Sequence, residues 1–153
     1  MIERWKGYTS VVERLNEDVV RKRFKQQFMW MIKREAEALN RLSKYKNFPK
    51  IVSVQDKYID ISYCGIQAKQ IDRVQCLEIL LALAETKIVH RDITPRNLLS
   101  KKGIIYLIDF GWCLFDGEKE SPVVPPKSLG LRYYRHNKWD DKKAMEIVVL
   151  EMG

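Results

Sequence analysis

The chain has 153 residues, a length that fits one domain with one modest hydrophobic core. Hydrophobic residues make up 46% of it and four residues are tryptophans, a composition that excludes a disordered chain. Its formal net charge is +8, with the basic residues concentrated between positions 21 and 50. Solvated helix surfaces account for such a charge, and attraction to an anionic ligand is the functional alternative.

The cysteines and the apolar segments indicate where such a protein works. Cys64, Cys76 and Cys113 are widely spaced and form no metal-ligand pair, so we expect reduced thiols in a cytoplasmic protein. The sequence predicts no signal peptide and no membrane span. It contains no nucleic-acid-binding motif.

The first 61 residues predict a small sheet and one helix. Residues 1–22 alternate between polar and apolar side chains, which predicts two short strands around a turn at residues 15–18. Apolar residues recur at helical spacing from Phe24 to Leu42, which predicts a helix. Residues 51–54 and 58–61 are separated by a turn and are expected to form two further strands.

Glu35 lies on the apolar stripe of the helix predicted for residues 24–42, four residues before Leu39. A buried carboxylate is costly unless a cation meets it, so we expect a basic partner inside the protein. The alternative is that Glu35 reaches solvent at the margin of the stripe. Glu37 falls off the stripe and is expected to be a solvated surface residue.

The rest of the chain predicts two helices and a hairpin. A helix is expected from Ile71 to Glu85, with its apolar face formed by Val74, Leu77, Leu80, Leu81 and Ala84. Residues 98–108 predict two strands joined at a Lys-Lys-Gly turn, and a proline-rich loop follows around residues 122–126. A last helix is expected after Asp141.

Two polar motifs flank the predicted hairpin. Residues 90–97 read HRDITPRN, and residues 109–111 read DFG. Phosphoryl transfer needs a carboxylate near the attacking hydroxyl, here Asp92, and oxygen ligands that hold Mg²⁺ against nucleotide phosphates, here Asn97 and Asp109. In order, spacing and hairpin context, these motifs resemble the catalytic loop and DFG turn of eukaryotic-type protein kinases.

The resemblance implies a two-lobed α+β fold in a single minimal domain, residues 1–153. Its N-terminal lobe, about residues 1–61, would hold a small antiparallel sheet and the kinase helix αC. Residues 62–66 would form the hinge. Residues 67–153 would form a truncated helical lobe that ends at the kinase helix αF.

The resemblance also implies ATP and Mg²⁺ as cofactors and assigns the central site residues. Asp92 would accept the proton of the substrate hydroxyl, while Asn97 and Asp109 would hold the metal. Lys22 would act with them by pairing with the α and β phosphates, with Lys25 as its rival, and Glu35 would be the glutamate that holds this lysine.

The outer parts of the nucleotide site follow from weaker similarities. Ile61 resembles the gatekeeper, and the backbones of Ser62 and Cys64 would meet the adenine edge. Gly7 and Ser10 resemble the end of the glycine-rich loop, G-x-x-G-x-V, with Ser10 in place of a glycine. An ordinary glycine at a strand edge is the alternative for Gly7.

Five further residues would support the site: His90, Arg91, Phe110, Gly111 and Asp141. His90 would hydrogen-bond near the DFG turn, and Asp141 would support the backbone of the catalytic loop. Arg91 would meet an anion of the activation segment, or alternatively form a surface salt bridge. Residues 130–138 resemble the end of that segment, with Leu131 and Lys138 departing from the kinase pattern.

The expected function is transfer of the γ-phosphoryl group of ATP to a hydroxyl acceptor, in first place by a protein Ser/Thr or Tyr kinase. Thr94 replaces the lysine of Ser/Thr kinases, and Arg96 resembles tyrosine kinases although Pro95 does not. A small sugar or lipopolysaccharide-type glycan kinase is the second hypothesis, and a nucleotide-binding pseudokinase is the third. The apolar residues of the last helix are expected to be partly exposed, and either self-association through them or a reordered chain end should follow; these residues are Ile147, Val148, Leu150 and Met152.

Overall fold

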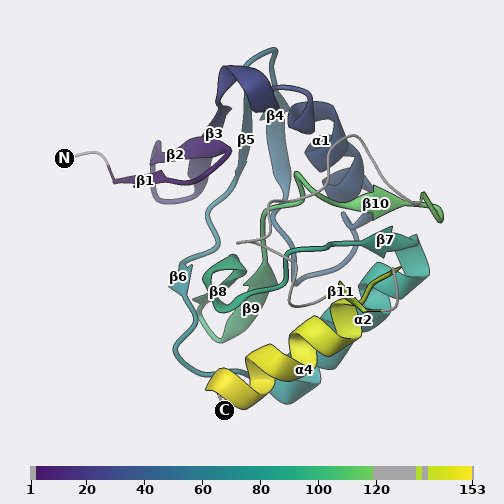
Figure 1. Ribbon diagram of the computed structural model, residues 1–153. Coiled ribbons are helices and arrows are strands. Elements are labelled where there is room, and N and C mark those ends of the chain that lie inside the picture. Colours follow the sequence, from purple (N-terminus) through teal and green to yellow (C-terminus); the bar gives the residue numbers. More distant parts are fainter. Residues whose placement is uncertain (1–2, 119–133, 136–137, 153) are drawn as a thin grey trace.

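The two-lobed α+β arrangement expected from the sequence is present in the computed structural model, which describes residues 3–118, 134–135 and 138–152. A five-stranded sheet and helix α1 form one lobe, and helices α2 and α4 with short strands form the other (Figure 1). The expected fold class is therefore confirmed.

The sheet of the first lobe is antiparallel throughout, in the order β1-β2-β3-β5-β4. Three strands, where two were expected, precede the first helix, and the turn at residues 15–18 is present between β2 and β3. Asn16 Oδ1 closes this turn by accepting from the backbone N–H groups of Asp18 and Val19. The strands are β1 (Arg4–Lys6), β2 (Ser10–Arg14), β3 (Val19–Phe24), β4 (Ile51–Val54) and β5 (Tyr58–Ser62).

Helix α1 (Met31–Arg41) is shorter than the sequence predicted, and a 3₁₀ turn, η1 (Gln26–Phe28), precedes it. The expected start at Phe24 is wrong, because Phe24 is the last residue of β3 and pairs with Ser10. Its side chain is buried as a strand residue. The helical spacing from Phe24 to Phe28 is accidental, because the two residues belong to two consecutive elements, β3 and η1. The hydrogen bonds between β2 and β3 keep Phe24 in the strand.

The second lobe contains the predicted hairpin and two helices. Strands β8 and β9 pair in register, and the turn between them uses left-handed backbone at Lys102 and Gly103. The elements are β6 (Ile66–Gln67), α2 (Arg73–Thr86), β7 (Ile88–Val89), η2 (Pro95–Asn97), β8 (Leu98–Lys101), β9 (Ile104–Leu107), β10 (Leu114–Phe115), β11 (Tyr134–Arg135), β12 (Lys138–Trp139) and α4 (Asp141–Met152).

The apolar face predicted for α2 is wrong except at Leu80, which is partly buried and packs against the core. Val74, Leu77 and Leu81 are 64%, 60% and 63% exposed, and Ala84 is also exposed. The helix instead buries the opposite side, which consists of Gln75, Cys76, Ile79, Ala82 and Leu83. Apolar residues lie on both sides of α2, so their spacing predicted the helix without deciding which side faces the core.

The hydrogen bonds of Gln75 explain why this side of α2 faces the core. Its Oε1 accepts from the backbone N–H of Ile105 at 2.8 Å and from Asn47 Nδ2 at 3.1 Å. Its Nε2 donates to the backbone carbonyl of Gly103 at 2.9 Å. These bonds tie the first turn of α2 to the β8–β9 hairpin, and Asp72 caps the helix by accepting from the N–H groups of Val74 and Gln75.

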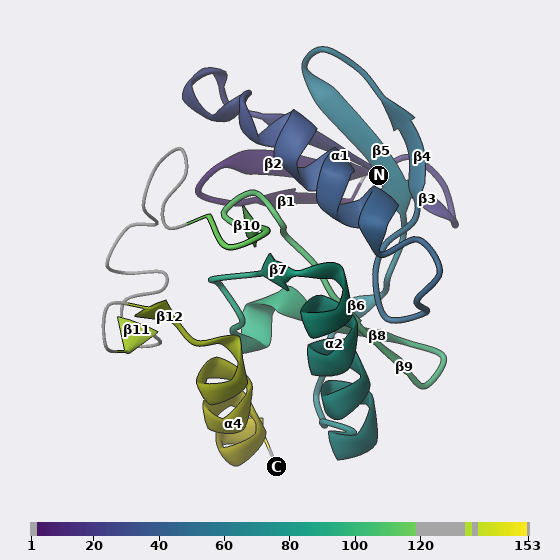
Figure 2. The same ribbon diagram turned by 90° about the vertical axis from the view of Figure 1, so that its right-hand side faces the viewer.

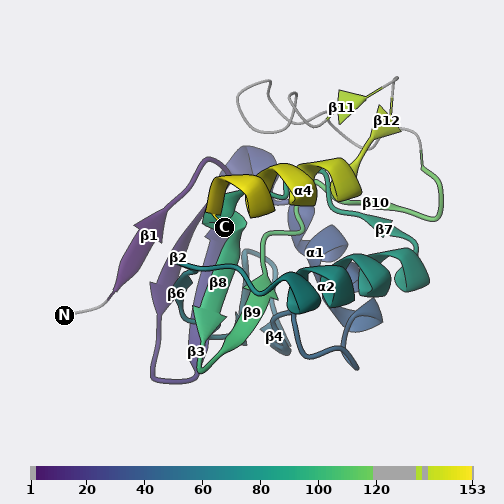
Figure 3. The same ribbon diagram turned by 90° about the horizontal axis from the view of Figure 1, so that it is seen from below.

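Helix α4 packs alongside α2 at the base of the second lobe (Figures 2 and 3). The expectation that its apolar residues would be exposed is wrong for Val148, which is fully buried. Ile147 and Met152 are half-buried, and Leu150 is 80% exposed. The resemblance to the end of an activation segment at residues 130–138 falls largely outside the described residues. Within the described ranges, no helix combines the length and the apolar character needed to cross a membrane.

Gly65 allows the chain to enter the second lobe. Its φ is +93°, and a Cβ there would lie 2.0 Å from the backbone oxygen of Ser100. We predict that Gly65→Ala lowers the free energy of unfolding by about 2–4 kcal/mol, because it adds a backbone clash to left-handed strain. Gly103→Ala is the matched control, since Gly103 has a φ of +82° and open space around it. Equal urea midpoints for the two variants would contradict the predicted clash.

Candidate active site

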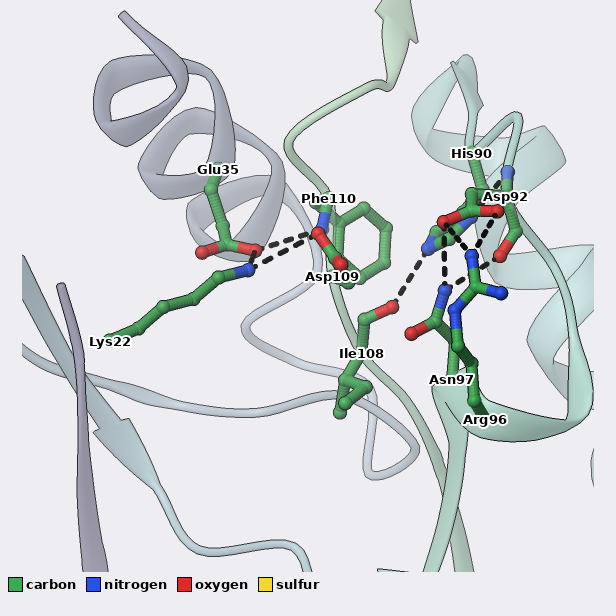
Figure 4. Close-up of polar contacts among 9 residues, drawn as sticks. All are labelled: Lys22, Glu35, His90, Asp92, Arg96, Asn97, Ile108, Asp109 and Phe110. Carbon is green, nitrogen blue, oxygen red and sulfur yellow. Dashed lines mark hydrogen bonds and ion pairs between the residues drawn. The ribbon is translucent and has the colours of Figure 1, made fainter. Parts of the chain in front are cut away.

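The motifs singled out from the sequence converge between the two lobes (Figure 4). Lys22 comes from β3, Glu35 from α1, and Asp109 from the segment after β9. Asp92 and Asn97 come from the loop between β7 and β8. The site thus draws on both lobes.

Lys22 is the centre of the first group. Its Nζ lies 2.9 Å from Glu35 Oε1 and 3.2 Å from Asp109 Oδ1. The backbone N–H of Phe110 also donates to Glu35 Oε1, at 2.8 Å. Glu35 is buried as predicted, so the alternative that it reaches solvent is wrong. Lys25, the alternative to Lys22, is exposed. Glu37 is also exposed and forms an ion pair with Arg41 of the same helix.

The charges in this group stabilise one another. Burial by itself lowers the pKa of Lys22, but the two carboxylates of Asp109 and Glu35 outweigh burial and raise that pKa above its ordinary value. Burial likewise raises the pKa of Asp109, and the Lys22 ammonium outweighs it, so that this pKa lies below its usual range. Lys22 and Asp109 therefore both remain charged at neutral pH.

Asp92 is the buried carboxylate of the second group. Asn97 Nδ2 donates to its backbone oxygen at 2.8 Å and to Oδ2 at 3.1 Å, and Arg96 Nη2 lies 3.3 Å from both carboxylate oxygens. Burial and the nearby Asp109 raise the pKa of Asp92 to about 6, against the opposing effects of His90, Arg96 and Asn97. A carboxylate with such a pKa is ionised at neutral pH and well suited to accept a proton.

His90 holds the backbone around Asp92. Its Nδ1 accepts from the backbone N–H of Asp92 at 3.0 Å, so the ring proton is on Nε2, which contacts the carbonyl of Ile108 at 2.9 Å. The His90 and Phe110 rings pack edge to face, with their centres 4.8 Å apart. His90 thus joins the catalytic loop to the DFG turn.

Asp141 braces the same loop from the start of α4. Its carboxylate accepts from the backbone N–H groups of His90 at 2.6 Å and Arg91 at 3.1 Å. Arg91 has a φ of +73° and Asp109 a φ of +68°, a strained conformation for residues other than glycine. The Arg91 side chain is buried and its Nε donates to the carbonyl of Trp112, so this side chain does not lie at the surface.

Register in the β8–β9 hairpin aligns the two segments that carry the expected metal ligands. Leu98 pairs with Leu107, and the next residues continue the ladder, since the N–H of Ile108 donates to the carbonyl of Asn97 at 3.0 Å. Asn97 therefore lies across from the residue that precedes Asp109. The hairpin supplies the alignment that the sequence spacing predicted.

The donor set at this position fits Mg²⁺. The side-chain hydrogen bonds of Asn97 use its nitrogen, which leaves its amide oxygen, and Asp109 adds a carboxylate. Hard oxygen ligands of this kind suit Mg²⁺, which usually takes one or two protein ligands together with phosphate oxygens and water. The described residues contain no cluster of three or more His, Cys, Asp or Glu side chains that could hold a metal ion.

The expected hinge residues lie where β5 ends. Ile61 is buried in the sheet, and the N–H groups of Ser62 and Tyr63 donate to the carbonyls of Lys50 and Asp18. The carbonyl of Ser62 receives a long contact of 3.5 Å from the Cys64 thiol.

Gly7 and Ser10 close the tight turn between β1 and β2, where the N–H of Gly7 donates to the carbonyl of Ser10 at 2.8 Å. A Cβ at Gly7 would meet ordinary van der Waals contact, so the turn itself does not require glycine. Ser10 is buried and pairs with Phe24 across the sheet.

Gly111 allows helix α1 to approach the DFG turn. A Cβ at this position would lie 2.6 Å from the Met31 sulfur, and Met31 is fully buried at the start of α1. Phe110 is fully buried beside it and stacks edge-on against Phe48. The DFG turn and α1 are therefore packed as one unit.

Several contacts of the site were not predicted from the sequence, among them those of Lys22 with Asp109 and of the Phe110 N–H with Glu35. The carbonyl of Trp112 holds Arg91, and no residue-type signal reports a backbone contact. Arg96 contacts Asp92 at the spacing i, i+4, which is the spacing at which side chains meet on one helical turn and which could have indicated this pair.

We predict that Glu35→Ala lowers the free energy of unfolding by about 2–4 kcal/mol, because Lys22 and the Phe110 N–H lose a buried partner. Glu37→Ala on the same helix should cost less than about 1 kcal/mol, as expected for an exposed ion pair. Urea unfolding of the two variants measures both values. Equal losses would show that the Glu35 carboxylate is not held by buried partners.

Comparison with known proteins places the chain in a family. The model of the RIO domain matches residues 2–120, which include every site residue above except Asp141. The chain is also 32% identical over 126 residues to Cyclin-dependent kinase F-4 of Oryza sativa subsp. japonica, an alignment that covers 67% of this chain and 26% of the rice protein. The chain thus spans about a quarter of that relative's length. It belongs to the RIO domain family, within the protein kinase-like superfamily.

Proposed function

We propose that this protein transfers the γ-phosphoryl group of ATP to a hydroxyl acceptor. The observation that carries the proposal is the pairing of two groups, Lys22 between Glu35 and Asp109 on one side, and Asp92 with Asn97 on the other. Membership of a kinase-like family supports the same reaction. The boundaries that go with it are a first lobe of about residues 1–61, a hinge at 62–66 and a second lobe at 67–153.

Each residue has one task in this proposal. Lys22, held by Glu35, binds the α and β phosphates as a charged ammonium. Asp109 and Asn97 would hold Mg²⁺, which when bound would neutralise charge on the phosphates. Asp92 orients the acceptor hydroxyl and takes its proton. Asn97 and His90 hold the backbone of Asp92 in place through hydrogen bonds.

The outer contacts of ATP complete the proposal. Ile61 would line the adenine pocket, and the backbone groups of Ser62 and Cys64 would meet the adenine edge. The turn from Gly7 to Ser10 would lie over the phosphates and contribute backbone N–H groups.

A protein Ser/Thr or Tyr side chain is the first acceptor that we propose. A small glycan is the second, because Thr94 is buried where Ser/Thr kinases have a lysine and Arg96 is the cation next to Asp92. Arg96 would suit an acceptor with a nearby anionic group. A pseudokinase role is the third possibility, and the complete set of Lys22, Asp92, Asn97 and Asp109 argues against it.

We further propose a cytoplasmic location and self-association. The location is supported by three cysteines that are all buried and unpaired. Self-association would use the exposed face of α2 rather than α4. In an antiparallel pair of α2 helices that cross at the level of Ile79, Leu77 of one copy would lie opposite Leu81 of the other.

The remaining exposed positions of α2 fit the same antiparallel arrangement. Val74 would face the small Ala84 of the second copy, and Arg73 would face its Glu85, all of them exposed residues. The face is therefore self-complementary in both apolar contact and charge, as a two-fold interface requires.

Transfer from radiolabelled ATP to a generic protein substrate, to lipopolysaccharide-type glycans or to neither separates the three acceptor hypotheses. We predict that Asp92→Asn lowers turnover by at least about a hundredfold and preserves ATP binding, because the proton-accepting carboxylate alone is lost. Isothermal titration with ATP and Mg²⁺ measures the binding. An undiminished rate in this variant would rule out Asp92 as the proton acceptor.

The pH dependence tests the same residue without a mutation. Because the pKa of Asp92 is raised to about 6, the carboxylate becomes protonated below that pH and cannot accept a proton. We predict that kcat/KM falls by about tenfold for each pH unit below this value and is level above it. An acid limb near the ordinary aspartate pKa would contradict the assignment.

For self-association, we predict that Leu77→Lys converts a dimer to a monomer in light scattering, because it places like charges at the centre of the α2 pair. Leu150→Lys is the control, since Leu150 is exposed on α4 and lies outside the proposed face. A monomeric parent protein, or dissociation by the control, would contradict the α2 interface.

A further inference from the structure

Helix α1 is bound ionically to a turn of the second lobe. The turn spans residues 115–118, beginning at the last residue of β10, and carries the carboxylates of Asp116 and Glu118. Arg34 and Arg41 of α1 form ion pairs with these two carboxylates. We refer to these four charged residues, together with Phe115, as the α1 clamp.

Arg41 forms the first half of the α1 clamp. Its two Nη atoms each lie 3.0 Å from one oxygen of Asp116, in a bidentate arrangement. Its Nη1 also contacts the backbone carbonyl of Thr86 at the end of α2, at 3.4 Å. Its guanidinium lies 4.5 Å from the centre of the Phe115 ring. Arg41 therefore joins α1 to two separate elements of the second lobe.

Arg34 forms the second half, two helical turns earlier. Its Nη atoms lie 2.8 and 3.3 Å from the two oxygens of Glu118, and Nη1 also donates to the carbonyl of Cys113 at 3.0 Å. Its guanidinium lies 5.1 Å from the Phe115 ring, which is thus contacted by both arginines. Bidentate pairs that share a ring are stronger than the single exposed ion pairs that contribute little.

The turn that receives the arginines is itself well defined. Glu118 bonds back to Phe115 twice, through its backbone N–H at 2.8 Å and through Oε1 at 2.7 Å. The N–H of Asp116 donates to the carbonyl of Lys87 at 3.0 Å, and β10 pairs with β7. Asp116 and Gly117 have φ values of +50° and +81°, which make the turn tight. It therefore offers a preformed pair of carboxylates.

The two arginines of the α1 clamp lie on either side of Glu35 in the sequence of α1. Glu35 follows Arg34 directly, and its contacts with Lys22 and the Phe110 N–H require α1 to stay close to the DFG turn. We propose that Arg34 and Arg41 are positioning residues, which hold α1 against the second lobe so that Glu35 remains engaged. The consequence for phosphoryl transfer rests on the function proposed above, but the positioning itself does not.

The test removes the two carboxylate charges with little change in shape, in the double variant D116N/E118Q. Asparagine tolerates the left-handed backbone at position 116, and glutamine can still accept from Phe115. The control is E17Q/D56N, which makes the same change in net charge at two exposed residues of the sheet turns. Hydrogen exchange of the α1 amides and the Phe110 amide is compared with exchange in the β8–β9 hairpin.

We expect exchange of the α1 and Phe110 amides to become roughly tenfold faster in D116N/E118Q, with the hairpin and the control unchanged. High salt should move the parent protein toward the variant and leave the variant unaffected, because the clamp is electrostatic. Unchanged protection of the Phe110 amide in D116N/E118Q would overturn the proposal. Since exchange is measured without ATP or acceptor, this outcome is independent of whether the protein transfers phosphate.

Discussion

The site depends on one arrangement of charge, the Lys22 ammonium between the carboxylates of Glu35 and Asp109. Each of these groups would be costly to bury alone, and together they compensate one another. Because they come from β3, α1 and the DFG turn, their attraction also brings these three elements together. The hydrogen bond from Phe110 to Glu35 adds backbone to the same group, so that the position of α1 and the conformation of the DFG turn are coupled.

The second lobe builds its part of the site by holding backbone in a strained conformation. Arg91 and Asp109 both have positive φ, which neither residue favours. Asp141 and His90 offset this strain with hydrogen bonds to the loop backbone, and burial raises the pKa of Asp141 above its ordinary value. The result presents Asp92 beside Asn97, and the roles proposed for them as proton acceptor and metal ligand depend on this geometry.

Most of the site could be predicted because its signals are local. The spacing between Asp92 and Asn97 corresponds to one short turn, and the hairpin between Asn97 and Asp109 is encoded by two apolar runs around Lys-Lys-Gly. Glu35 could be placed because a carboxylate on an apolar stripe implies a buried cation. The match to the RIO domain covers the same region, and the sequence motifs and the family agree about the fold.

The sequence by itself determined the existence of the helices, the β8–β9 hairpin and the inward position of Glu35, because periodicity and turn residues act over a few positions. Tertiary structure decided which side of α2 is buried, since apolar residues lie on both sides and the hydrogen bonds of Gln75 to the hairpin choose between them. It also decided that β3 extends through Phe24 and that Arg34 and Arg41 meet Glu118 and Asp116. Partners 75 and 84 residues apart carry no local signal, so their pairing follows from the packed fold.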